Sequence, residues 1–145
     1  PVVSGTTGWT NQRESVIDAC NQNHGSFFHA PNFSIGVNLF FQITDFMGAT
    51  MNGIPGFELS MSEAHHAAKL DIPRGTAIAL ADILLLTGIH EIHYKSDFDS
   101  ITLKHEALSR RGFAQGAVLA AEFIIGKKGI FGMKDLLASL QIKHV

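Results

Sequence analysis

The sequence predicts an α+β fold, in which a mixed open sheet is packed by helices, on the strength of three observations. The first part alternates strand, turn and helix patterns, as α/β proteins do. The second half contains segments in which apolar and polar residues alternate, which indicates half-buried strands. Apolar residues at helical spacing after Ser34, over Thr76–Leu86 and from Ser109 onward supply the helices.

Composition limits the classes of function. The chain has 145 residues, enough for a real core, and its 46% apolar and 17% charged residues are typical of a globular protein. With a net charge of −2 and no basic stripe, no nucleic-acid partner is expected. We also expect no membrane association, because no apolar run could span a bilayer and no signal-peptide pattern opens the chain. The single cysteine, Cys20, fits a cytoplasmic location.

Two turns in the first part follow predicted strands. The opening residues indicate the end of a buried strand that runs into the turn Gly5–Gly8. A helix capped by Asn11 is expected to run to about Asn21. A short strand over Ser26–Ala30 then meets a break at Pro31–Ser34. Because ligands of α/β sheets bind at the carboxyl ends of strands, the two turns point to one possible site.

The later elements follow from apolar spacing. The helix after Ser34 should pack through Val37, Phe40, Phe41, Thr44 and Met47. Strands are predicted over Phe57–Met61, Ile89–Lys95 and Ile101–Ala107, the last two forming an antiparallel hairpin. The helix from Ser109 to about Ile125 should pack through Phe113, Ala117, Ala120, Ala121 and Ile124. A short helix over Met133–Leu140 closes the chain.

The segment Glu63–Ala77 concentrates groups that can bind anions and move protons. His65, His66 and Lys69 stand close together and precede a Pro-x-Gly-Thr turn at the start of an apolar helix. Imidazoles supply protons near neutral pH, and a helix start holds anions. We therefore interpret the segment as an active-site loop for a small carboxylate-bearing substrate. On local sequence alone, a solvated loop explains it equally well.

Two basic groups have alternative roles. Lys69 either stays charged and holds an anion, or has its pKa lowered by burial and donates a proton. Arg110-Arg111 is either a carboxylate clamp or a surface charge pair, and the residues alone favour the surface pair.

The remaining histidines predict no metal site. His90 and His93 are three apart on a predicted strand, so they fall on opposite faces. His105 lies on the apolar face of its strand and is interpreted as structural. No cysteine pair or H-E-x-x-H spacing supports zinc.

Four motifs together resemble the 4-hydroxy-tetrahydrodipicolinate (dihydrodipicolinate) reductase family. In chain order they are Gly5-Thr6-Thr7-Gly8; Ala30-Pro31-Asn32-Phe33-Ser34 with Gly36-Val37-Asn38; Glu63-Ala64-His65-His66 with Lys69, Asp71, Pro73, Gly75, Thr76 and Ala77; and Ser109-Arg110 with Phe113-Ala114 and Gly116-Ala117. The resemblance covers nearly the whole chain, and the third motif is highly specific.

The resemblance implies reduction of a cyclic dicarboxylate by NADPH or NADH, in lysine and diaminopimelate biosynthesis, by a homotetramer that assembles through the sheet. It makes His65 the proton donor and Lys69 a second acid or the group that polarises the ring nitrogen. It assigns substrate binding to His66, Gly75, Thr76 and Arg110. It assigns contacts with the nicotinamide end of the cofactor to Gly5, Thr6, Thr7, Ala30, Pro31, Asn32 and Phe33.

The chain also departs from the family pattern. The glycine fingerprint of the family's Rossmann-type domain is absent, so residues 1–33 are expected to be the tail of that domain and residues 34–145 the substrate-binding and oligomerisation domain. The resemblance indicates that a family segment is missing near residues 86–88, and Arg74 replaces a serine of the family pattern. We expect the 145 residues alone to be inactive or nearly so. The alternative is a non-catalytic remnant that binds a dicarboxylate or only oligomerises.

Overall fold

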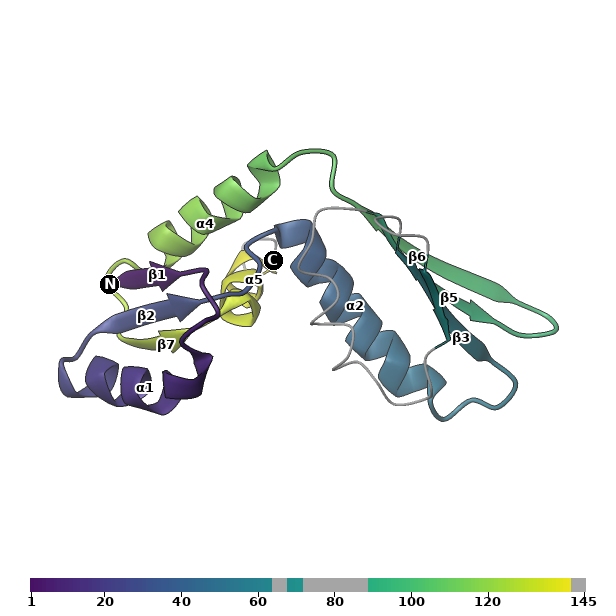
Figure 1. Cartoon of the computed structure of the whole chain (residues 1–145), viewed down its shortest axis with the longest axis horizontal. Coiled ribbons are helices and arrows are strands. Elements are labelled where there is room, and N and C mark those ends of the chain that lie inside the picture. The colour runs from purple at the N-terminus through teal and green to yellow at the C-terminus, as the bar shows by residue number, and fades with distance from the viewer. Residues whose placement is uncertain (64–67, 72–88, 142–145) are drawn as a thin grey trace. The chain divides into compact units, whose positions relative to one another are not determined.

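A computed structural model describes residues 1–63, 68–71 and 89–141 of the chain (Figure 1). The chain divides into two compact units, Pro1–Asn38 with Arg111–Val145, and Leu39–Arg110. This division differs from the expected boundary at residues 33 and 34. Residues after Arg110 return to the first unit because their strand extends its sheet and their helices pack on that sheet.

The first unit is built on a parallel sheet with the strand order β1-β2-β7. Its strands are β1 (Val2–Ser4), β2 (Ser26–His29) and β7 (Gly129–Phe131). Its helices are η1 (Thr10–Gln12), α1 (Arg13–Gln22), α4 (Arg111–Ile124) and α5 (Met133–Gln141). Figure 1 shows α1 and α4 on opposite sides of these strands. The strand, helix, strand order of the sequence thus gives a small α/β layer.

The core of the first unit lies between the sheet and the helices α4 and α5. Phe28 is fully buried in the middle strand and clusters with Ala120, Ile124 and Leu136. The expected packing stripe of α4 is right at Ala120 and Ile124 but wrong at Ala121, which is exposed. The stripe continues through Gly116, because every fourth residue faces the sheet.

Helix α1 begins differently from the prediction. Asn11 does not cap it, because residues 10–12 form a 3-10 turn that carries the chain into the helix. Gln12 occupies the cap position and makes no side-chain capping bond. The expected end near Asn21 is close to the observed end at Gln22.

The second unit packs helix α2 against an antiparallel sheet of order β4-β3-β5-β6. Helix α2 covers Ile35–Met51, and the strands are β3 (Glu58–Glu63), β4 (Ala68–Asp71), β5 (Ile89–Lys95) and β6 (Ser100–Glu106). The predicted hairpin of β5 and β6 is confirmed. One parallel and one antiparallel sheet, each with helices, confirm the α+β fold class.

The core of the second unit is apolar at its centre. Phe40 of α2 packs with Met61, Ile92 and Tyr94 of the sheet. Phe41 and Met47 are partly buried against this cluster, as predicted, and Thr44 is buried. Among the described helices of the chain, none is both long enough and apolar enough to cross a membrane.

Two strands correct the sequence interpretation. The segment Glu63–Ala77 was expected to be a loop, but its residues Ala68–Asp71 form β4, which pairs antiparallel with β3. Strand β7 was not predicted, because three residues between a glycine turn and a helix carry no readable alternation. The helix expected over Thr76–Leu86 lies outside the described residues.

Candidate functional site

The turns after β1 and β2 come together at the carboxyl ends of these parallel strands. The Ala30 amide donates a hydrogen bond to the Ser4 carbonyl oxygen, at 3.2 Å. His29 Nε2 lies 3.1 Å from the Thr6 carbonyl oxygen, which can accept a hydrogen bond from an Nε2–H group. A Cβ atom on Gly5 would lie 3.1 Å from Phe33 Cε2, so glycine lets the Phe33 ring pack close to this turn. The two turns that the sequence singled out are therefore neighbours.

Asn32 organises the second turn. Its side chain is 4% exposed, and its Oδ1 accepts a 2.8 Å hydrogen bond from the Ser34 amide. Asn38 Nδ2 donates to the carbonyl oxygens of Asn32 and Ser34, at 2.9 and 2.8 Å. Within the described residues, Asn32 Nδ2 has no hydrogen-bond partner. Because a buried donor without an acceptor is costly, this turn offers a fixed donor to a ligand.

Tight packing against Phe28 and α4 holds the turn Ala30–Ser34 in place. Phe33 stacks on Phe28, with 5.9 Å between the ring centroids. Gly116 of α4 packs directly against the Phe33 carbonyl, and a Cβ atom there would overlap the carbonyl oxygen. Ser34 Oγ accepts a 3.3 Å hydrogen bond from the Val37 amide and so caps α2. These contacts fix the backbone of Ala30–Phe33.

A cavity next to these turns was not anticipated from the sequence. It has a volume of about 220 Å³ and is lined by side chains that include Trp9, Arg13, His29 and Asp135. The Trp9 and His29 rings meet edge to face, 4.7 Å apart. The strand patterns held no signal for it, because its lining comes from Trp9, α1, β2, β7 and the start of α5, which are far apart in the sequence.

The structure describes only part of the predicted catalytic segment. His65, His66, Gly75 and Thr76 lie outside the described residues. The backbone of Lys69 lies on β4, in register with Ser62 of β3. Arg110 is exposed in the turn before α4. The expectation that Lys69 sits in a loop is therefore corrected, because β3 offers β4 an edge with which to pair.

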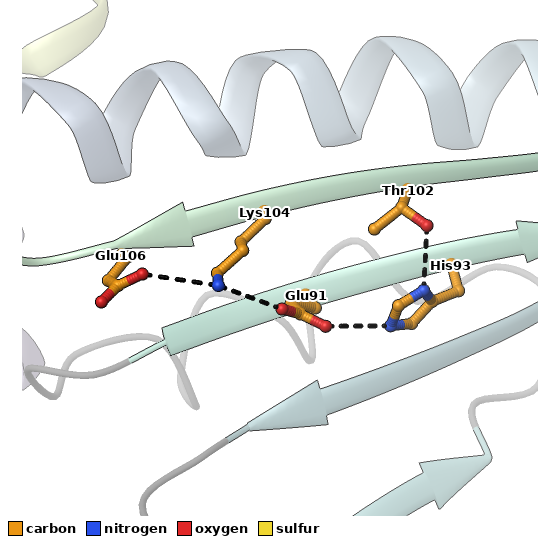
Figure 2. Close-up of polar contacts among 5 residues, drawn as sticks. All are labelled: Glu91, His93, Thr102, Lys104 and Glu106. Carbon is orange, nitrogen blue, oxygen red and sulfur yellow. Dashed lines mark hydrogen bonds and ion pairs between the residues drawn. The ribbon is translucent and has the colours of Figure 1, made fainter.

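The position of Lys69 belongs to a row of polar residues that crosses the antiparallel sheet. The row of neighbouring positions runs from Lys69 through Ser62 and Glu91 to Lys104. Figure 2 shows that Glu91 lies between two side chains, with Oε2 3.4 Å from His93 Nε2 and Oε1 3.6 Å from Lys104 Nζ. Glu91 was missed by sequence reasoning, although its alternation with the buried Ile92 marked it as facing away from the core.

The network in Figure 2 extends to both sides of Glu91. Lys104 Nζ also lies 3.4 Å from Glu106 Oε2, and His93 Nδ1 lies 3.1 Å from Thr102 Oγ1. All these side chains keep partial contact with solvent, so each ion pair contributes little to stability, typically below about 1 kcal/mol. The network therefore organises charge on this face more than it stabilises the fold.

Two groups on the opposite face of the sheet have altered acidity. Burial, with a smaller contribution from the neighbouring His90, lowers the pKa of His105 below its usual 6.5. Burial raises the pKa of the Tyr94 phenol above its usual 10.0. Both groups are therefore neutral at pH 7. In the part of the chain that the structure describes, no group of three or more His, Cys, Asp or Glu side chains is placed to hold a metal ion.

Comparison with known proteins identifies the family. A sequence profile described as "Dihydrodipicolinate reductase, C-terminus" matches residues 36–87 and 84–137. A 4-hydroxy-tetrahydrodipicolinate reductase of Christiangramia forsetii is 38% identical over 168 residues, which cover 97% of this chain and 70% of that protein. The chain belongs to the 4-hydroxy-tetrahydrodipicolinate reductase family.

Other members of the reductase family align over a similar range. The reductase of Methanosarcina barkeri is 32% identical over 94% of this chain and 63% of its own length. The chain thus spans about two thirds of the relatives it matches. A solved structure described as dipicolinate-bound dihydrodipicolinate reductase from Paenisporosarcina sp. TG-14 shares the fold, with a TM-score of 0.60 at 19% identity, over 90% of this chain and 62% of that one.

Proposed function

We propose that this chain provides the substrate-binding and nicotinamide-facing parts of an enzyme that reduces 4-hydroxy-tetrahydrodipicolinate to tetrahydrodipicolinate, using NADPH or NADH, in lysine and diaminopimelate biosynthesis. The observation that carries the proposal is the meeting of the turns Gly5–Thr7 and Ala30–Phe33 at the carboxyl ends of β1 and β2. This is the edge where sheets of this kind bind dinucleotides. Membership of the reductase family supplies the reaction.

The residues of the two turns fit a nicotinamide group. Gly5 lets the Phe33 ring lie close to its backbone, and the buried Asn32 Nδ2 is a donor without a described acceptor. The Gly5, Thr6 and Thr7 backbone would hold one side of the ring, with Ala30, Pro31, Asn32 and Phe33 on the other. Bound here, the cofactor supplies a hydride to a carbon of the substrate.

The segment after β3 would supply the proton and hold the substrate. In this proposal His65 donates the proton that accompanies the hydride, and the 4-hydroxyl group leaves as water. Lys69 acts as a second acid or polarises the ring nitrogen. His66, the Gly75-Thr76 turn and Arg110 bind the two carboxylates and so orient the ring. General acid catalysis of this kind contributes about 10²- to 10⁴-fold to a rate.

The domain arrangement is proposed in a revised form. Residues 1–38 and 111–145, which form one compact unit, would belong to the dinucleotide-binding side, and Leu39–Arg110 would carry substrate binding and assembly. The two profile matches meet at residues 84–87, and the alignment with the Christiangramia forsetii reductase is longer than this 145-residue chain. Both facts support a family segment being absent near residues 86–88.

The first test is the intact mass of the natural protein. The 145 residues account for 15.7 kDa. A larger mass identifies a longer reductase, whose activity is then measured on that whole protein. A mass near 15.7 kDa favours the non-catalytic alternative, and titration with dipicolinate then asks whether the polypeptide still binds a dicarboxylate.

The second test compares two histidine variants of the intact protein. His65→Ala should lower kcat for substrate-dependent NADPH or NADH oxidation by about a hundredfold or more. His24→Asn is the matched control, because His24 is exposed with a φ of 47°, a conformation that asparagine tolerates. It should leave kcat unchanged. An intact protein that oxidises neither cofactor with substrate present would contradict the proposed function.

A further inference from the structure

The face of the antiparallel sheet that packs against α2 is apolar over most of its length and polar at one end. Neighbouring positions on β3, β5 and β6 form three rows across this face. Two of the rows are apolar, namely Leu59–Tyr94–Ile101 and Met61–Ile92–Leu103. The third row, Glu63–His90–His105, contains only ionisable residues. It lies at the end of β3 from which the chain enters the segment with His65 and His66.

The two imidazoles of the third row form a packed pair. The His90 and His105 rings stack with centroids 6.0 Å apart and an interplanar angle of 20°. His90 is 1% exposed, and the Phe40 ring of α2 has its centroid 6.0 Å from that of His105. His105 Nδ1 is buried and has no hydrogen-bond partner among the described residues. The pair is therefore held by ring packing from two strands and a helix.

An apolar side chain at position 105 would serve the core better than an imidazole. Burying a polar nitrogen without a partner costs about 1–3 kcal/mol, whereas leucine or phenylalanine would continue the neighbouring apolar rows at no such cost. His105 thus reduces stability at the end of the sheet from which β3 leads into the segment expected to be catalytic. Polar groups that a core retains at such a cost are commonly found at functional sites.

We propose that His90 and His105 are positioning residues for the catalytic segment, acting through the end of β3. His90 stands directly opposite Glu63, and Glu63 precedes Ala64-His65-His66 in the chain. The His105 ring keeps the His90 ring in place, and His90 in turn supports the end of β3 at Glu63. This role rests on the proposed function of His65 and His66.

The test separates the shape of the His105 ring from its polarity. His105→Phe keeps an aromatic ring against His90 and Phe40, whereas His105→Gln keeps a polar group. Leu103→Met is the matched control, because Leu103 lies on the same strand and face, in the neighbouring apolar row. In the intact protein, His105→Phe should lower kcat about tenfold or more, since small displacements of catalytic groups have large effects.

The expected pattern excludes a purely structural role. His105→Phe should lower kcat without a lower melting temperature and without a change in KM for the cofactor, and His105→Gln should recover part of the loss. Leu103→Met should leave kcat unchanged. Unchanged kcat in His105→Phe, with an active wild type, would overturn the proposal, as would equal losses in His105→Phe and Leu103→Met.

A second measurement does not need activity. In protein with isotope-labelled histidine, the imidazole NMR signals of His65 and His66 should move in His105→Phe and stay in place in Leu103→Met. If the wild type proves inactive, the proposed function fails, and these spectra alone decide the inference. Unmoved His65 and His66 signals in His105→Phe would overturn it.

Discussion

At the scale of single residues, the titration of His105 makes stability depend on pH. Its pKa is lowered in the folded protein, so below about pH 6.5 the unfolded chain binds more protons than the folded one. The free energy of unfolding that depends on His105 is therefore present at neutral pH and falls as the pH is lowered through 6.5. Urea unfolding measures the free energy of unfolding at pH 7.5 and at pH 5.5. Its decrease between these two pH values should be smaller for His105→Phe than for the wild type. Equal losses would contradict this assignment.

Also at the scale of single residues, alanine substitutions at the two glycines of α4 should have opposite effects on the free energy of unfolding. Gly116→Ala should reduce the free energy of unfolding by about 1–3 kcal/mol, because the new methyl group overlaps the Phe33 carbonyl and the helix must shift. Gly112→Ala is the control, since a Cβ atom there meets nothing within 4 Å, and it should stabilise the helix by up to about 1 kcal/mol. Denaturant unfolding measures both. A neutral Gly116→Ala would show that the close contact is not required.

At the scale of elements, α2 packs on the antiparallel sheet through the helix face that carries Phe40. Phe40 is 6% exposed and packs on Met61, Ile92 and Tyr94, whereas Phe46 on the same helix is 72% exposed. Phe40→Ala should cost about 3–5 kcal/mol of unfolding free energy, because it removes a large buried side chain. Phe46→Ala should change it by about 0.5 kcal/mol or less. Similar losses for the two variants would mean that α2 packs through a different face.

The strands show why some elements were predictable and others were not. The hairpin of β5 and β6 was predictable because apolar and polar residues alternate along β6 and only a short turn separates the two strands. Alternation places residues on the two faces of a sheet. Strand β7 was not, because its three residues become a strand only by pairing with β2. Strand β4 was read as a loop for the same reason, since its pairing with β3 is what orders it.

At the scale of the whole molecule, the predicted state is a homotetramer. The sheet face with Glu91, His93 and Lys104 carries a charged network. Among the described strands, β4 and β6 are the edges of this sheet, and edge strands need cover. Sedimentation equilibrium should give four times the chain mass, and a stable monomer would contradict the prediction. Lys104→Glu should weaken assembly, because it sets like charges around Glu91 and Glu106, and His24→Asn should not.

The sequence by itself determined the family, the α+β class and two turns of the first unit. These turns are Gly5–Gly8, with its two glycines, and Pro31–Ser34, which contains Asn32. These features depend on local patterns, namely motif identity, alternation and backbone-permissive residues. The tertiary structure decided that residues 111–145 join the first unit and that Lys69 lies on a strand in register with Ser62. It also set Glu63, His90 and His105 in one row. Pairing between distant strands fixes these relations, and no local pattern encodes which strand will be the partner.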